Sequence, residues 1–447
     1  MNFYRARAIA WVLIGFGMSA GAAAALDAPS TQHHAKPTEK HPAVSHHAAS
    51  HHAAAARPAA RSVSNRAAQK AAPAGEARLS VRGKVKAGAR GATRHHHYYE
   101  RFTASSFANS DLLAGDQTAG EDAVVRQAAI DALGDMNGTA VVIDPSNGRI
   151  LAMVNQKLAL SPGAEPCSTI KLTVAMAALS EGLVTRDTPV KLAGFHMNMT
   201  QALAKSNNLY FEELGRELGF DRVRYYANQF GLGELAGYNI EGEQLGVYPD
   251  QELPAAEGGV ARMCSFGQGV SLTPLQLGAY VAALANGGTL YYLQHPTTAE
   301  ETAAFEPKIK RTLDIARYVP DIEDGMAGAV QYGTARRLRA NFHELPVFGK
   351  TGTCSDKGTR YGWFASFSDP SQGSLVTVFF LEGGRPTFGP RAAELTGEFY
   401  KNLWDRDYFT EKNQDARNDS GNAQPSAPAS APATVFPSPA ASTPAEQ

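Results

Sequence analysis

A sharp change in composition divides this chain of 447 residues into one foldable block between two low-complexity segments. Residues 27–98 are mainly Ala, His, Pro, Ser, Lys and Arg, and residues 412–447 are mainly Asn, Asp, Ser, Ala and Pro. Neither segment has enough large apolar side chains to offset the entropy lost on folding, so we predict that both are disordered. The remaining residues, 99–411, make a block of about 310 residues, which is enough for one large core with two subdomains.

The low-complexity segment before this block is strongly basic. Residues 27–98 carry twelve Lys and Arg residues against three Asp and Glu residues. Two interpretations remain open: a solvated linker whose charges repel one another, or a segment that attracts an anionic membrane or the carboxylates of a cell wall. Its clustered His residues have no fixed geometry, so we expect no metal site in this chain.

The N-terminus has the layout of an export signal. Arg5 and Arg7 precede an uncharged run at residues 8–26, which ends in small residues. This pattern is typical of a signal peptide cleaved after Ala25, but a run of about 19 residues is also long enough for an uncleaved membrane anchor. Both interpretations place the folded block in the periplasm, tethered to the inner membrane or free of it. Nucleic acid is not an expected partner there.

The hydrophobic pattern of the block predicts a mixture of helices and antiparallel strands. Apolar residues recur at helical spacing in five segments, at residues 121–136, 168–183, 202–230 (one or two helices), 275–285 and 390–404. Two β-rich runs, 138–144 and 149–154, flank the turn 145–148 and predict a hairpin. Three further strand-like runs, 346–354, 361–367 and 374–381, are separated by turn residues, so we expect them to pair as an antiparallel meander.

Three short motifs stand in order along the block: Ser168-Thr169-Ile170-Lys171, Ser206-Asn207-Asn208 and Lys350-Thr351-Gly352-Thr353. A serine hydroxyl is a weak nucleophile until a nearby base takes its proton. Lys171 follows Ser168 by three residues and shares its helix face. The lysine must be neutral part of the time, which requires burial or a neighbouring cation such as Lys350. The alternative is that Ser168 only caps a helix.

The other two motifs complete a serine acyl-transfer site, S-x-x-K with S-x-N and K-T-G. In this interpretation Ser206 passes a proton to the leaving group and the amide of Asn208 holds the substrate backbone. The K-T-G-T run is expected to be an edge strand that pairs with an extended peptide, with Gly352 permitting close approach. Lys350, Thr351 and Thr353 are expected to meet a substrate carboxylate. Each motif alone is weak, and their shared order strengthens the assignment.

The sequence around these motifs resembles the transpeptidase domain of high-molecular-weight class B penicillin-binding proteins. The similar segments are residues 140–153, 165–168, 202–206, 231–233, 238–243, 266–269, 273–276, 333–335 and 361–364. The resemblance implies an α/β (α+β) fold with a five-stranded antiparallel sheet flanked by helices, plus an all-helical subdomain. It also implies a D,D-transpeptidase that cross-links D-Ala-D-Ala peptidoglycan stem peptides, is acylated by β-lactams such as penicillin, and needs no cofactor.

Residue roles follow from the same resemblance. Ser168 is expected to be the acylated nucleophile, Lys171 the base and Ser206 the proton relay. Asn208 is expected to contact a substrate amide, with the K-T-G-T residues binding the substrate as above. The backbone N–H groups of Ser168 and Thr353 are expected to form the oxyanion hole.

The cysteines depart from the family pattern. Cys167 stands where the family usually has Gly, and Cys354 directly follows Thr353. Two oxyanion donors must lie within roughly 6 Å of each other, so their sequence neighbours come within disulfide range. We therefore predict a Cys167–Cys354 bridge, which resembles that of carbapenem-hydrolysing class A β-lactamases; two buried free thiols are the alternative. Cys264 is expected to be a buried free thiol.

The motifs do not separate transfer to an amine from transfer to water, so D,D-carboxypeptidase and β-lactamase activities stay open. A class A β-lactamase uses a Glu in an E-x-x-L-N pattern, and the stretch with Glu241 and Glu243 lacks that Asn. A receptor that is acylated without turnover, or a cell-wall scaffold, is a further alternative. No glycosyltransferase domain fits before residue 99, so we expect no glycan polymerisation.

Overall fold

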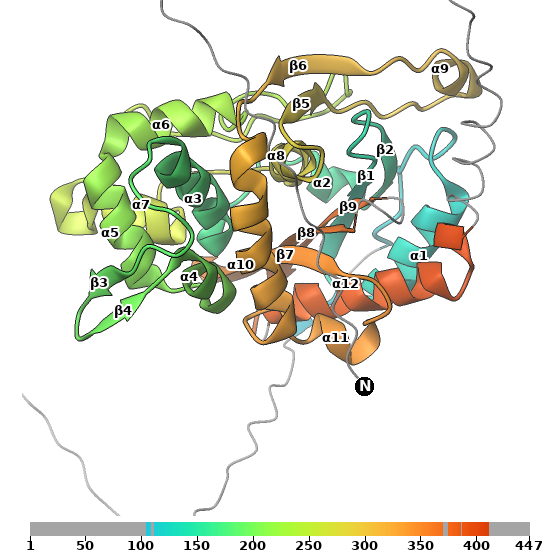
Figure 1. Cartoon of the computed structure of the whole chain (residues 1–447). Coiled ribbons are helices and arrows are strands. Elements are labelled where there is room, and N and C mark those ends of the chain that lie inside the picture. Colours follow the sequence, from blue (N-terminus) through green and yellow to red (C-terminus); the bar gives the residue numbers. More distant parts are fainter. Residues whose placement is uncertain (1–103, 109–110, 370–373, 386, 411–447) are drawn as a thin grey trace, which may run out of the picture. The chain divides into compact units, whose positions relative to one another are not determined.

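The computed structural model describes residues 104–108, 111–369, 374–385 and 387–410 (Figure 1). The predictions for the export signal, the basic segment 27–98 and the tail 412–447 concern residues outside this part of the chain. Among the residues that are described, no helix is both long and apolar enough to cross a membrane.

A five-stranded antiparallel sheet runs through the folded block in the order β2-β1-β9-β8-β7. Its strands are β1 (Gly138–Ile143), β2 (Ile150–Val154), β7 (Val347–Asp356), β8 (Thr359–Ser368) and β9 (Val376–Gly383). The predicted hairpin is β1–β2 and the predicted meander is β7–β8–β9, so both predictions are confirmed. β7, which carries the K-T-G-T motif, is an edge strand, as expected.

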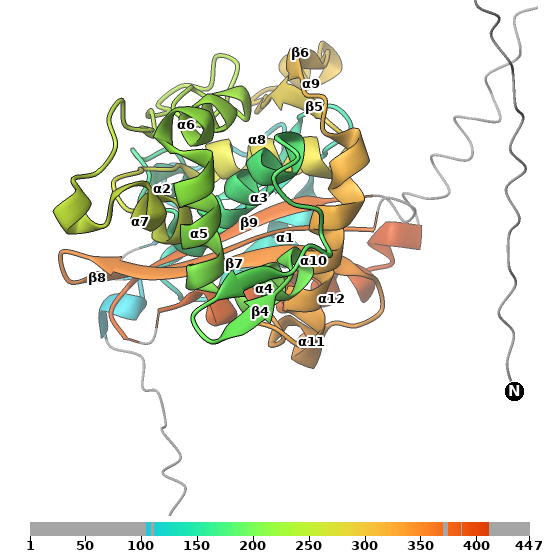
Figure 2. The ribbon, with the colours of Figure 1, turned by 60° about the vertical axis from the view of Figure 1, so that its left-hand side comes forward.

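Both faces of the sheet are covered by helices, because successive strand residues alternate between two apolar clusters. Val141 and Ile143 of β1 pack in one cluster, and Ala140 and Val142 in the other. Figures 1 and 2 show α1 (Ala123–Leu133) and α12 (Gly389–Trp404) along one face and α8 (Pro274–Ala285) against the other. The site motifs therefore rest on a sheet that is buried from both sides.

A layer of helices lies beside α8 and holds the first two motifs. It consists of α3 (Lys171–Ser180), α4 (Met199–Lys205), α5 (Asn208–Leu218), α6 (Phe220–Gln229) and α7 (Gly259–Phe266). α10 (Val319–Gln331) packs against both α4 and β7, so it joins this layer to the edge of the sheet. The shorter elements are α2 (Gln156–Ala159), α9 (Ala299–Ala303), α11 (Leu338–Asn341), the 3-10 helices Ala104–Ser106, Cys167–Ile170, Ala255–Glu257 and Ala316–Tyr318, and the hairpins β3 (Val190–Leu192)–β4 (Phe195–Met197) and β5 (Thr289–Tyr292)–β6 (Lys308–Thr312).

The helix limits follow the capping residues. Asp122 accepts hydrogen bonds from the backbone N–H groups at the start of α1. Thr273 and Gln276 form a reciprocal capping box at the start of α8, with Pro274 as its first residue.

Two helix predictions need correction. The segment 202–230 was expected to form one or two helices, but three helices, α4, α5 and α6, occupy it. The chain breaks at Ser206 and at Gly219, which have φ angles of 53° and 74°, in the region that interrupts a right-handed helix. The segment 168–183 starts as a 3-10 turn and becomes α-helical only from Lys171 to Ser180.

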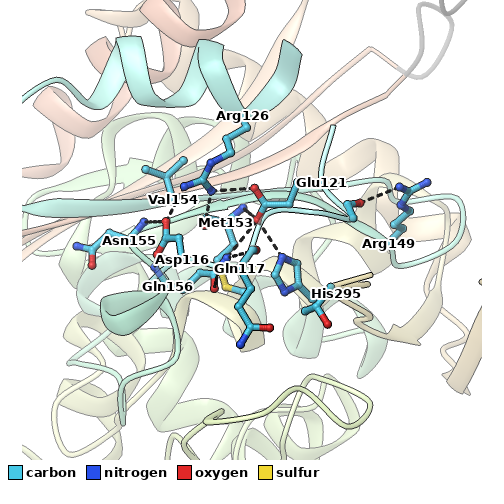
Figure 3. Close-up of polar contacts among 12 residues, drawn as sticks. Asp116, Gln117, Glu121, Arg126, Arg149, Met153, Val154, Asn155, Gln156 and His295 are labelled. Atoms are coloured by element: carbon cyan, nitrogen blue, oxygen red, sulfur yellow. Dashed lines mark hydrogen bonds and ion pairs between the residues drawn. The ribbon is translucent and has the colours of Figure 1, made fainter. Parts of the chain in front are cut away.

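A buried polar cluster attaches the segment before α1 to the sheet, as Figure 3 shows. Glu121 accepts hydrogen bonds from the backbone N–H of Met153 and from Arg126, and it pairs with His295 at 2.9 Å. Arg126 also pairs with Asp116 at 2.8 Å. The Asp116, Glu121 and His295 side chains are at most 4% exposed. We call Asp116, Glu121, Arg126 and His295 the polar clasp.

Candidate active site

Ser168 lies in the 3-10 turn that leads into α3, and Lys171 is the first residue of α3. The half-buried Ser168 and the fully buried Lys171 are brought together, with 3.0 Å between Ser168 Oγ and Lys171 Nζ. Cys167 has a φ angle of 53°, a left-handed conformation that costs a non-glycine residue energy. The chain therefore turns sharply just before the serine and presents its hydroxyl to the amine.

The amine of Lys171 is surrounded by oxygen atoms from the second motif. It lies 2.8 Å from the carbonyl oxygen of Ser206, 3.2 Å from Ser206 Oγ and 2.6 Å from Asn208 Oδ1. Burial, and after it the positive charge of Lys350, lower the pKa of Lys171 to about 6. A large share of Lys171 is therefore a neutral amine at neutral pH, which is the form that can accept a proton.

The apolar pattern of residues 202–230 predicts that the second motif lies within a helix. In the structure the motif instead forms the connection between α4 and α5. Ser206 ends α4 in a left-handed conformation, which directs its side chain and its carbonyl group toward Lys171. Asn207 caps α5 through a hydrogen bond from the backbone N–H of Tyr210 at 3.0 Å. Asn208 is the first residue of α5. Ser and Asn are common at such helix ends, so these residue types fit a connection between helices.

Lys350, in β7, contacts Ser206 as well. Its side chain is fully buried, and its Nζ donates hydrogen bonds to Ser206 Oγ and to the backbone carbonyl of Thr351, both at 2.9 Å. Burial lowers the pKa of Lys350 to about 7. Ser206 Oγ thus lies between the amines of Lys171 and Lys350, so it can receive a proton from one side and donate one to the other.

The three residues after Lys350 follow along the edge strand. Thr351 is buried, whereas Thr353 is exposed and its Oγ1 accepts a hydrogen bond from the backbone N–H of Gly389. The K-T-G-T pattern predicts close approach of a substrate at Gly352. In the structure, a Cβ atom at Gly352 would lie 2.8 Å from the carbonyl oxygen of Pro166. The lack of a side chain at this position therefore lets the segment before Ser168 pack directly against β7.

A disulfide joins Cys167 to Cys354, the predicted pair, with 5.5 Å between their Cα atoms. It links the residue before Ser168 to the residue after the K-T-G-T motif. The indole N–H of Trp363 donates to the carbonyl oxygen of Glu165 at 3.0 Å and adds a second link between β8 and the same segment. Cys264 is a free, buried cysteine, as predicted, and burial raises its thiol pKa.

The structure adds one residue to this cluster that the sequence analysis did not assign. Thr334 Oγ1 lies 2.6 Å from Thr351 Oγ1. Thr334 belongs to the triplet Gly333-Thr334-Ala335, which is similar to the family sequence but to which the sequence pattern alone assigns no function.

The carboxylate of Glu243 is occupied within its own loop. It accepts hydrogen bonds from the backbone N–H groups of Ala236 and Gly237. Together with the missing Asn of the E-x-x-L-N pattern, these contacts give Glu243 a structural role in shaping the loop.

Comparison with known sequences agrees with this geometry. Residues 138–401 match the profile described as the penicillin binding protein transpeptidase domain. The chain is 27% identical over 383 residues to the peptidoglycan D,D-transpeptidase MrdA of Acinetobacter baumannii, covering 66% of this chain and 56% of that protein. It is 29% identical over 315 residues to the stage V sporulation protein D of Bacillus subtilis, covering 59% and 48%. The chain thus spans about half the length of these relatives.

Solved structures share the fold. PBP2 of Pseudomonas aeruginosa superposes with a TM-score of 0.53 at 23% identity, covering 64% of this chain and 74% of that chain. A D,D-transpeptidase domain from Eggerthella lenta gives a TM-score of 0.51 at 20% identity, covering 63% and 81%. The predicted fold class, a five-stranded antiparallel sheet flanked by helices, is confirmed.

Proposed function

This chain belongs to the penicillin-binding protein transpeptidase family, and from that premise we propose that it is a serine D,D-transpeptidase acting on D-Ala-D-Ala stem peptides of peptidoglycan. The observation that carries the proposal is the pairing of Ser168 Oγ with the buried amine of Lys171 at 3.0 Å. A pKa lowered to about 6 supports Lys171 as the base, because the neutral amine can take the serine proton at neutral pH.

The first half of the reaction forms an acyl-enzyme. Ser168 Oγ attacks the carbonyl carbon of the penultimate D-Ala while its proton moves to Lys171 Nζ. The bond between that carbon and the nitrogen of the terminal D-Ala then breaks. The leaving amine takes a proton from Ser206 Oγ, which regains one from the Lys171 ammonium 3.2 Å away. The products are free D-Ala and an ester on Ser168.

The second half transfers the acyl group to the amine of another stem peptide. That amine attacks the ester carbonyl and loses a proton through Ser206 and Lys171, and the proton returns to Ser168 Oγ as the ester bond breaks. A new peptide bond links the two stem peptides. A β-lactam enters by the same first step, with its ring amide in place of the D-Ala-D-Ala bond.

Substrate binding is assigned to the edge of the sheet. β7 is an edge strand and is assigned to backbone pairing with an extended peptide. Asn208, whose Oδ1 lies 2.6 Å from Lys171 Nζ, is assigned to contact with a substrate amide. Lys350, Thr351 and Thr353 are assigned to the substrate carboxylate. We assign the oxyanion hole to the backbone N–H groups of Ser168 and Thr353, whose neighbours are held together by the disulfide.

The alternatives differ in the fate of the acyl group. A D,D-carboxypeptidase or a β-lactamase would release it to water, a receptor would keep it, and a scaffold would form no acyl-enzyme. The occupied carboxylate of Glu243 argues against a class A-like deacylating group at that position. The family's transferase activity is therefore the function that we favour.

The partners and the location extend the proposal to residues outside the described part of the chain. We assign the catalytic block to the periplasm, with residues 1–26 as a membrane anchor or a cleaved signal. The basic segment 27–98 is assigned to contact with an anionic membrane or wall surface.

The test uses a fluorescent penicillin. The purified protein is incubated with the drug, and both the protein adduct and the free hydrolysed drug are measured over time, with Ser168→Ala as the control. A long-lived adduct that is absent in Ser168→Ala supports a penicillin-binding transpeptidase. Rapid release of hydrolysed drug would instead make the protein a β-lactamase, and the lack of any adduct would leave a scaffold.

A further inference from the structure

The triplet Gly333-Thr334-Ala335, which follows α10, lies between the second and third motifs. Its first residue permits very close packing: a Cβ atom at Gly333 would lie 2.0 Å from the carbonyl oxygen of Ala204. Only glycine therefore fits where the end of α10 meets the end of α4. Ala335 is fully buried and fixes the other end of the triplet in the core.

The backbone of Thr334 binds the helix that presents Ser206. Its N–H donates to the carbonyl oxygen of Ala204 at 3.1 Å. Ala204 lies in the last turn of α4, where carbonyl groups lack partners inside their own helix. Thr334 thus completes the end of α4, two residues before Ser206.

The side chain of Thr334 binds the third motif. Its hydroxyl lies 2.6 Å from the hydroxyl of Thr351, so one of the two donates to the other. A carboxylate only accepts hydrogen bonds. Thr351 can therefore donate to a substrate carboxylate only if its own oxygen accepts the proton of Thr334. Thr351 is only 4% exposed, so its surroundings and the contact with Thr334 limit the orientations open to its hydroxyl.

We propose that Thr334 is a positioning residue that orients the Thr351 hydroxyl toward the free carboxylate of the substrate and holds it in register with Ser206. This inference rests on the proposed function and deepens it, because it makes Thr334 a determinant of selectivity for substrates that end in a carboxylate. Thr334 acts through Thr351 and does not itself touch the reacting atoms.

The test compares acylation by benzylpenicillin with acylation by its methyl ester, which lacks the carboxylate charge. Second-order acylation rates are measured by stopped-flow or by intact-protein mass spectrometry for the wild type and Thr334→Val, which keeps the shape and loses the hydroxyl. We expect the rate with benzylpenicillin to fall about tenfold, the effect of one oriented hydrogen bond to a charged group, and the rate with the ester to fall less than about twofold.

Three variants complete the experiment. Thr334→Ser restores the hydroxyl and should restore the preference for the free acid. Thr312→Val changes an exposed threonine of β6 in the same way and should change neither rate. In a double-mutant cycle, Thr334→Val should add little to the loss caused by Thr351→Val, because both remove one hydrogen-bonded unit.

The outcomes separate this inference from the proposed function. Equal losses with acid and ester, or additive losses in the cycle, would overturn the role of Thr334 while leaving the acyl-transfer proposal intact. A wild type that reacts with neither compound would refute the proposed function and the inference with it. The thermal unfolding temperature of each variant shows whether a lower acylation rate results from a less stable fold.

Discussion

The amine of Lys171 lies where burial and a second amine both oppose its positive charge. No carboxylate is hydrogen-bonded to this amine in the described part of the chain; its polar contacts are with Ser168, Ser206 and Asn208. Removal from water is the largest cause of its lowered pKa, and the charge of Lys350 is the next. The charge of Glu212 opposes this lowering of the pKa but does not outweigh it. A buried amine with no hydrogen-bonded carboxylate is suited to act as a base near neutral pH.

The first prediction concerns the pH dependence of acylation. Below its pKa of about 6, Lys171 is an ammonium ion and cannot take the proton of Ser168, so the rate should fall as the pH falls through 6. Above pH 7 the rate should fall again, because Lys350, whose pKa is about 7, loses the positive charge assigned to the substrate carboxylate. The second-order rate with benzylpenicillin is measured between pH 4.5 and pH 8, in a range chosen around that value. A rate that stays constant over this range, or keeps rising with a midpoint near the ordinary lysine pKa of about 10.4, contradicts the role of Lys171.

A variant of Lys350 provides the control for this pH profile. Lys350→Met removes the positive charge that helps to lower the pKa of Lys171. The midpoint of the profile should then move to higher pH, even though the overall rate also falls. A midpoint that does not move would mean that the profile reports another group.

At the scale of elements, the site depends on how a turn, a helix connection and a strand meet. The disulfide joins the turn that carries Ser168 to β7 across 187 positions in the sequence. The left-handed conformation of Cys167 suits Gly better than any other residue, so the bridge holds a backbone shape that the side chain disfavours.

The second prediction therefore concerns two pairs of substitutions. Cys167→Ser with Cys354→Ser should lower the free energy of unfolding by roughly 2–5 kcal/mol, the usual effect of losing a disulfide that closes a long loop. Cys167→Gly with Cys354→Ser should recover about 1 kcal/mol of that loss, because glycine accepts the left-handed conformation. Urea unfolding measures both values, and Cys264→Ala shows the effect of a cysteine outside the bridge. Equal stability of the two double variants would count against the backbone argument.

The third prediction concerns the connection between α4 and α5. Asn207 caps α5 by accepting a hydrogen bond from the backbone N–H of Tyr210. Asn207→Ala should reduce the free energy of unfolding by about 1 kcal/mol, whereas Asn207→Asp, which keeps the acceptor, should be nearly neutral. Chemical denaturation of the two variants decides the matter, and an Ala variant as stable as the wild type would exclude the cap.

Local sequence patterns were enough to predict some elements and not others. The β1–β2 hairpin and the β7–β8–β9 meander were predictable because their strands are apolar runs bounded by turn residues. The short, half-exposed hairpins β3–β4 and β5–β6 carry no such runs. The break at Ser206 was missed because apolar residues continue at helical spacing on both sides of it.

The candidate site was predictable in its residues but not in its contacts. The order of the three motifs predicts that Ser168, Lys171, Ser206 and Lys350 share one site. In the structure Lys171 lies within hydrogen-bond distance of Ser168 and Ser206, and Lys350 within hydrogen-bond distance of Ser206. The Thr334–Thr351 contact depends on where α10 ends against β7. That packing has no local signal in the sequence.

At the scale of the whole folded block, the polar clasp attaches the segment at residues 116–126 to the central sheet. Glu121, at 1% exposure, is the shared acceptor of Arg126, His295 and the backbone N–H of Met153. Removing one member of such a buried network leaves the others with unmet charge or hydrogen bonds. The clasp therefore stabilises the segment at residues 116–126 against the sheet.

The fourth prediction tests the clasp. Glu121→Ala should lower the free energy of unfolding by about 3 kcal/mol, because it leaves a buried guanidinium short of a partner. Asp187→Asn removes a carboxylate that is 76% exposed and pairs with Arg186, and it should change stability by less than about 0.5 kcal/mol. Similar small effects of both substitutions in urea unfolding would show that the clasp does not stabilise the fold.

The most direct test of the central claim identifies the atom that is acylated. The protein is labelled with benzylpenicillin at pH 7, digested and sequenced by tandem mass spectrometry, with Lys171→Ala labelled in parallel. The account predicts one drug molecule per protein, attached to Ser168, and a strongly reduced yield in Lys171→Ala. An adduct on any other residue, or undiminished labelling without Lys171, would contradict it.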